Sequence, residues 1–167
     1  MDNAEWSANV AVVVDGVLRA PNDNAAIMSG ALLYHSLVKS HNVTLIVDSM
    51  AKSQVQYWLR MNGMVDHSGE VYYEVGDPES APERRKIQVR KIKQHGALAF
   101  VVESDTEVAE ALHEIGVPTM LYVHPKYMLP DHRPGFEEVM TPWNSLVSTV
   151  RKEKEMRAMD VRLNDNF

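Results

Sequence analysis

The sequence predicts an α/β protein, a doubly wound three-layer sandwich built on a parallel five-stranded sheet. Two observations support this fold class. Short apolar runs alternate along the chain with longer segments whose apolar residues recur at helical spacing. The first run, residues 10–14, reads Val-Ala-Val-Val-Val, which is typical of a central strand buried on both faces. Alternating strands and helices connect through right-handed crossovers, so helices cover both faces of the sheet.

The strands and the helices between them follow in order. The expected strands are residues 10–14, 43–47, 71–75, 98–102 and 119–123. The expected helices are residues 27–38, 55–63, 82–95 and 104–115. In the first helix, Ile27, Ala31 and Tyr34 fall on one face. Ser104 is expected to cap the fourth helix, with Glu107 completing a capping box.

Residues 1–150 are expected to form one domain, followed by a short tail. From His124 to Met140 the pattern changes to a proline-rich stretch, which predicts an extended loop across the surface. The apolar spacing after Trp143 then predicts a last amphipathic helix that belongs to the same domain. Residues 151–167 are expected to be a charged, disordered tail.

The composition argues against several classes of protein. The chain has 167 residues and no cysteine, so neither a disulfide framework nor a thiolate zinc site is expected. Its net charge of −6 argues against a general nucleic-acid binder, which needs a basic surface. No apolar run reaches the ~20 residues of a membrane helix, and the first residues lack a signal-peptide pattern. We therefore expect a cytoplasmic protein that does not bind membranes.

The first strand ends in an acidic turn, Asp-Gly-Val-Leu, at residues 15–18. This pattern resembles the first motif of the haloacid dehalogenase-like (HAD) superfamily, a hydrophobic strand followed by Asp-x-Asp-Gly-Thr/Val-Leu. Asp15 matches the second Asp of that motif, whereas Val13 stands where the family has its nucleophile. The resemblance spans residues 8–123. It implies a HAD-like (Rossmannoid) sheet with strand order 5-4-1-2-3, which the residues alone leave open.

The resemblance also assigns roles to individual residues. In HAD phosphatases the first Asp attacks phosphorus while Mg²⁺ shields the phosphate charge, and the second Asp is the general acid/base, the position of Asp15. The resemblance assigns phosphate binding to Ser49, at a helix start, and to Lys86. Lys91 and Lys93 are the alternatives to Lys86. The basic residues of this helix are expected to form mainly a solvated face; they are Arg84, Arg85, Lys86, Arg90, Lys91 and Lys93.

The turn Glu103-Ser104-Asp105 stands where the family supplies metal-binding acids. The resemblance therefore implies weak Mg²⁺ binding by Asp15, Glu103 and Asp105, and no other cofactor. Without a carboxylate at Val13, the metal would lose its central ligand.

The chain also lacks room for a cap domain, because the segments between its motifs are short. The resemblance thus implies a capless HAD-like protein with an open site, which in the family accompanies large substrates or docking partners. The Val-Glu-Ser-Asp turn at 102–105, the His124-Pro125 loop and the later Pro142-Trp143 resemble, more weakly, short HAD-like proteins of actinobacterial phages. That likeness would place the chain in the host cytoplasm.

Three functions follow as hypotheses. The first is a HAD-fold protein without phosphatase activity, acting as a binding or assembly module for a protein partner or a second copy. The second is a Mg²⁺-dependent phosphatase or related phosphoric-ester hydrolase with a non-standard mechanism, in which water attacks directly and Asp15 or Glu103 activates it. The third is a metal-dependent nuclease that gathers carboxylates at the strand ends. The net charge of −6 makes the third the least favoured.

Overall fold

The computed structural model describes residues 8–21, 24–49, 51–124, 147 and 150. The chain divides into two units, Met1–Tyr127 and Met128–Phe167, and the sheet lies in the first. Among the described residues, no helix is long and apolar enough to cross a bilayer.

Most of the predicted C-terminal features cannot be compared with the structure. Val147 and Val150 are helical, within the predicted last helix. The proline-rich stretch beyond His124 and the tail at 151–167 lie outside the described residues. A single domain over 1–150 therefore stays a prediction.

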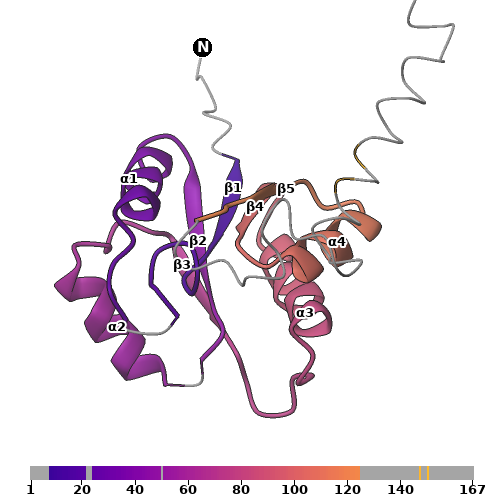
Figure 1. Ribbon diagram of the computed structural model, residues 1–167, viewed down its shortest axis with the longest axis horizontal. Helices are drawn as coiled ribbons and strands as arrows, with labels where there is room; N and C mark the ends of the chain where they lie inside the picture. Colours follow the sequence, from indigo (N-terminus) through magenta and orange to yellow (C-terminus); the bar gives the residue numbers. More distant parts are fainter. Residues whose placement is uncertain (1–7, 22–23, 50, 125–146, 148–149, 151–167) are drawn as a thin grey trace, which may run out of the picture. The chain divides into compact units, whose positions relative to one another are not determined.

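The sheet has five parallel strands in the order β3-β2-β1-β4-β5 (Figure 1). The strands are β1 (Asn9–Val13), β2 (Asn42–Val47), β3 (Gly69–Tyr72), β4 (Leu98–Glu103) and β5 (Thr119–Leu121). The predicted fold class and the predicted order, read from the opposite edge, are both confirmed.

Four helices join the strands in the described part of this unit. They are α1 (Met28–Leu37), α2 (Lys52–Met61), α3 (Ala81–Lys93) and α4 (Thr106–Glu114). Figure 1 shows α1 and α2 on one side of the sheet and α3 and α4 on the other. This three-layer arrangement follows from right-handed crossovers that run from β1 toward β3 and then back through β4 to β5.

The core is centred on β1, the middle strand. From Val10 to Val14 no side chain is more than 1% exposed. Both faces of β1 are covered by helices and both edges by β2 and β4, which is why its sequence is a continuous apolar run. The carboxyl end of β1 is therefore rigidly placed, and it positions the acidic turn that follows.

The start of α4 differs from the prediction. Asp105, not Ser104, is the N-cap, and its carboxylate accepts hydrogen bonds from the N–H groups of Glu107 and Val108 at 2.9 and 3.2 Å. The capping box based on Ser104 and Glu107 is therefore wrong. A carboxylate at a helix N-terminus also interacts favourably with the helix dipole, and this favours the aspartate over the neighbouring serine.

Gly30 lets α1 approach the chain that follows β1. A Cβ atom at Gly30 would lie 1.8 Å from the carbonyl oxygen of Val17, so no side chain fits there. One turn later, the fully buried Tyr34 accepts a hydrogen bond from the backbone N–H of Asp66 at 2.9 Å. The close approach at Gly30 thus fixes α1 against the acidic turn of β1.

We predict that Gly30→Ala lowers the free energy of unfolding by about 2 kcal/mol or more, because the added carbon overpacks this contact. This loss should appear although alanine favours a helix by ~1 kcal/mol over glycine. Urea unfolding measures it, with the exposed Ser36→Ala on the same helix as the matched control. Equal stability of Gly30→Ala and wild type would contradict the close approach.

Candidate functional site

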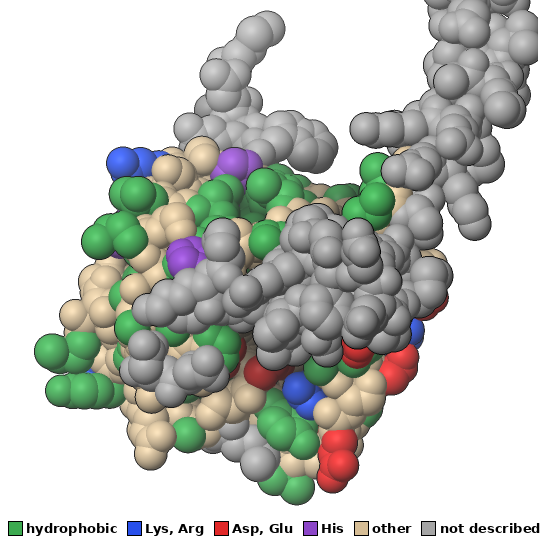
Figure 2. All heavy atoms as spheres, viewed as in Figure 1, with side chains coloured by type: hydrophobic (Ala, Val, Ile, Leu, Met, Phe, Trp, Pro, Cys, Tyr) green, Lys and Arg blue, Asp and Glu red, His purple; other side chains and the backbone are tan. Residues whose placement is uncertain are grey.

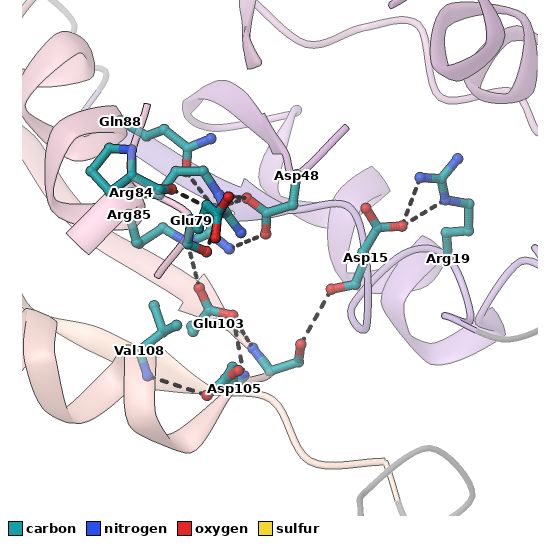
Figure 3. A network of polar contacts seen from close by, with 12 residues as sticks. Asp15, Arg19, Asp48, Glu79, Arg84, Arg85, Gln88, Glu103, Asp105 and Val108 are labelled. Carbon is teal, nitrogen blue, oxygen red and sulfur yellow. Dashed lines mark hydrogen bonds and ion pairs between the residues drawn. The ribbon is translucent and has the colours of Figure 1, made fainter. Parts of the chain in front are cut away.

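Acidic side chains follow three neighbouring strands at the carboxyl edge of the sheet. Asp15 follows β1, Asp48 follows β2 and Glu103 ends β4. Ligand sites in doubly wound sheets lie beyond this edge, where the strand order reverses. Figure 3 shows that Asp48 and Glu103 meet around Arg85, whereas Asp15 is turned toward Arg19. A second cation of α3 also reaches Asp48, since Arg84 Nε lies 3.4 Å from Asp48 Oδ1.

The guanidinium of Arg85, from α3, joins the ends of β2 and β4. Its Nε donates to Glu103 Oε2 at 2.7 Å, and its Nη1 and Nη2 donate to the two carboxylate oxygens of Asp48 at 3.1 and 2.5 Å. Nη1 also donates to Gln88 Oε1 at 2.7 Å. The side chains of Arg85 and Glu103 are 2% and 1% exposed, and that of Asp48 is 22% exposed. We call Arg85, Asp48 and Glu103 the arginine triad.

Burial and neighbouring charges shift the pKa values of the triad in opposite directions. Burial raises the pKa of Glu103, while Arg85 and the backbone N–H groups of Asp105 and Ser104 lower it; the net direction is upward. Burial would lower the pKa of Arg85, but Glu103 and Asp48 raise it above its ordinary value. Arg85 therefore stays charged in the interior, because two carboxylates compensate it.

Glu103 also connects the triad to the turn after β1. Its Oε1 accepts hydrogen bonds from the N–H groups of Ser104 and Asp105 at 2.8 and 3.1 Å. The Ser104 hydroxyl in turn donates to the carbonyl oxygen of Asp15 at 3.2 Å. Gly16 has φ +89°, and a Cβ atom there would lie 2.1 Å from Ser104 Oγ. The glycine of the acidic turn therefore makes room for Ser104.

Asp15 is held by an ion pair of its own. Arg19 donates from Nε and Nη2 to Asp15 Oδ1, each at 2.7 Å, and the two side chains are 13% and 28% exposed, respectively. The Arg19 guanidinium also lies 5.7 Å from the ring centroid of Trp58, in cation–π contact. Asp15 is thus only partly accessible, and an acid/base role stays a prediction.

The two predicted phosphate ligands have other contacts. Ser49 Oγ accepts a hydrogen bond from the N–H of Ala51 at 3.1 Å. Lys86 Nζ lies 2.9 Å from Glu83 Oε1 and 4.0 Å from Glu114 Oε2. Lys86 therefore pairs with acidic residues of α3 and α4, whereas its neighbour Arg85 lies at the ends of the strands.

The expected solvated face of α3 is wrong for Arg85 and also for Arg84, whose side chain is 12% exposed and pairs with Asp48 at 3.4 Å. Arg85, Val89 and Ile92 recur at i, i+4 and i+7, and all three are buried. Sequence reasoning missed Arg85 because a cation in a basic run is most simply solvated. The available signal was its position on the apolar stripe of the helix.

The acids that were predicted to bind Mg²⁺ make other contacts in the structure, and their metal binding stays a prediction. Among the described residues, no group of three or more His, Asp or Glu side chains could hold a metal ion. Both oxygens of Glu103 accept hydrogen bonds, Asp105 Oδ1 caps α4, and Asp15 pairs with Arg19. Mg²⁺ binding by Asp15, Glu103 and Asp105 would require several of these contacts to break.

The position of the family's nucleophile is apolar and inaccessible. Val13 is 1% exposed and belongs to the core cluster of β1. An alkyl side chain can neither attack phosphorus nor coordinate a metal.

The parallel sheet and the acidic carboxyl edge define a Rossmann-like α/β protein. Comparison with known proteins adds only a similarity of fold. No protein-family model and no curated protein sequence matches the chain. Two similar solved structures are chains of a Pnkp1/Rnl/Hen1 RNA repair complex, with TM-scores of 0.58 and 0.61 and sequence identities of 13% and 12%. Each match covers 74% of this chain but only 44% and 48% of the other, so this chain spans less than half of those chains.

We predict that Arg85→Met costs about 3–5 kcal/mol of stability, because it leaves the buried Glu103 without its cation. Adding Glu103→Gln to this variant should restore part of the loss, since it removes the unpaired charge and keeps an acceptor. Lys86→Met, one residue along, is the control and should cost less than about 1 kcal/mol. Urea unfolding of the four proteins decides the matter; equal costs for Arg85→Met and Lys86→Met would contradict the triad.

Proposed function

We propose that this protein has a HAD-like fold without phosphatase chemistry and acts as a binding or assembly module. The observation that carries the proposal is the arginine triad. The Asp-Gly-Val-Leu turn at 15–18 supports the family relationship, and the buried Val13 supports the loss of covalent catalysis. These features stand at the edge where an active relative would bind metal and phosphate.

The triad leaves Arg85 little capacity to bind a phosphate. A guanidinium has five N–H donors, and those of Arg85 make four hydrogen bonds to Asp48, Glu103 and Gln88. A phosphate would have to compete with two carboxylates that already match the planar, bidentate geometry of the cation. The same contacts keep Glu103 from serving as a metal ligand or as a base for water.

An exposed apolar stripe on α2 supports a binding role. Tyr57 and Met61, one turn apart, are 61% and 67% exposed, and Val65 just beyond the helix is 56% exposed. In Figure 2, hydrophobic side chains protrude at the left of the molecule, where α1 and α2 lie in Figure 1. Exposed apolar surface of this kind is typical of contacts between proteins. The first partner to test is a second copy of the chain.

We predict that the purified protein hydrolyses p-nitrophenyl phosphate no faster than background, with or without Mg²⁺, and that Asp15→Asn does not change this. A continuous absorbance assay measures the rate. Mg²⁺-dependent turnover that Asp15→Asn abolishes would instead support the hydrolase with a non-standard mechanism. Mg²⁺-dependent cleavage of a nucleic acid would support the nuclease.

The same preparations test the assembly role by sedimentation equilibrium. Wild type should associate reversibly as its concentration rises, and a Tyr57→Ser, Met61→Ser variant should not. Val75→Ser, at a residue that is 95% exposed beyond β3, is the matched surface control. A wild-type protein that stays monomeric throughout would exclude self-assembly through α2.

A further inference from the structure

The end of α2 carries the one Asn-Gly pair in the sequence, Asn62-Gly63. An asparagine before glycine is prone to deamidation, because glycine has no Cβ atom to obstruct attack by its own backbone nitrogen. In this step a bond forms between Gly63 N and Asn62 Cγ, the Cγ–Nδ2 bond breaks, and ammonia leaves with the proton of the Gly63 N–H. Water then opens the five-membered succinimide at either of its carbonyls, which leaves aspartate or isoaspartate at position 62.

The attacking nitrogen is held in the C-terminal cap of α2. The Gly63 N–H donates to the carbonyl oxygen of Arg60 at 3.2 Å. The next N–H, that of Met64, donates to the carbonyl oxygen of Leu59 at 2.9 Å. These two hydrogen bonds form a Schellman motif, in which the residue after the cap is left-handed, and Gly63 has φ +69°. While the cap is closed, the Gly63 nitrogen is engaged with the helix.

The leaving group is held by the same cap. Asn62 Nδ2 donates to the carbonyl oxygen of Trp58 at 2.8 Å. Asn62 also has a near-helical ψ of 11°, and this angle must change before its side chain can form a five-membered ring with the next nitrogen. Ring closure therefore needs the loss of two hydrogen bonds and a rotation of the backbone, so the closed cap opposes the reaction.

The cap is anchored from the protein side and open to solvent on the other. Leu59 and Met64 are each 1% exposed and belong to the apolar core. Gly63 is exposed, and a Cβ atom there would meet no described atom within 4 Å. Water therefore reaches the pair. The ends of helices also open locally at a lower cost than global unfolding, and such opening would release both reacting groups.

We propose that Asn62-Gly63 is a modification site, which deamidates when the cap of α2 opens. Aspartate at position 62 replaces the donor to the Trp58 carbonyl with a carboxylate, and negative charge at the C-terminus of a helix is unfavourable. Isoaspartate lengthens the main chain by one carbon, so the N–H groups of Gly63 and Met64 no longer align with their acceptors. Either product weakens the cap that protected the asparagine.

The modification also bears on the proposed assembly, because Val65 of the α2 stripe follows the cap directly. That consequence rests on the proposed function, whereas the deamidation itself needs no partner. Deamidation is read from peptide masses and assembly from sedimentation, so the two proposals fail separately.

The test compares the full chain in its folded state with the same chain in guanidinium chloride, both at mildly alkaline pH. Peptide mass spectrometry measures the fraction of aspartate and isoaspartate at position 62. The folded chain should deamidate at least about tenfold more slowly than the unfolded chain, because the cap must first open. Asn42, which precedes a valine, is the internal reference and should stay largely unmodified in both states, since a branched side chain obstructs the attack.

A variant then loosens the cap without changing the reacting pair. Met64→Ser removes the buried anchor and should speed deamidation of the folded protein at least about threefold. Met28→Ser, the same substitution at a residue that is 75% exposed on α1, is the matched control and should react like wild type. Melting temperatures show which variants are folded, and the comparison of folded with unfolded wild type decides if Met64→Ser is not.

Asn62→Gln should abolish the mass change in either state, because its longer side chain would have to close a six-membered ring. An unmodified Asn62 in the unfolded wild type would overturn the site. Equal rates in the folded and unfolded wild type, or in folded Met64→Ser and Met28→Ser, would overturn its control by the cap.

Discussion

The buried guanidinium of Arg85 is the contact on which the carboxyl edge of the sheet depends. It holds Asp48 after β2 and Glu103 at the end of β4. These two strands are not adjacent, because β1 lies between them in the sheet. Glu103 in turn accepts from the N–H of Ser104, whose hydroxyl reaches the carbonyl of Asp15 after β1. Arg85 of α3 therefore connects the turns after three strands. Removing it would leave a carboxylate buried without compensation.

This arrangement compensates the acidic edge of the sheet with cations from within the chain. Carboxylates gather at the ends of parallel strands because the topology brings those ends together. Such carboxylates can be compensated by a bound metal ion or by side-chain cations. Here Arg85 and Arg19 supply that charge from within the chain, so the negative charge of Asp48, Glu103 and Asp15 is already matched.

Much of the fold could be predicted from the sequence, because the spacing of apolar residues and the positions of turn residues indicate strands and helices directly. The central place of β1 followed from its unbroken apolar run, and the strand order came from a family resemblance that spans residues 8–123. The site was less predictable. The arginine triad was not predicted, because Arg85 was assigned to the solvated face of its helix. The apolar stripe of α3 indicates that Arg85 faces the sheet, whereas only tertiary packing shows which carboxylates it meets there.

The most direct test of this account is a calorimetric titration of Mg²⁺ into the wild-type protein, beside Val13→Asp. We expect no saturable heat from the wild type, because its carboxylates already pair with Arg85 and Arg19 or cap α4. A gain of binding in Val13→Asp alone would show that position 13 is where the site lost its central ligand. Stoichiometric Mg²⁺ binding by the wild type would contradict the central claim that internal cations replace the metal.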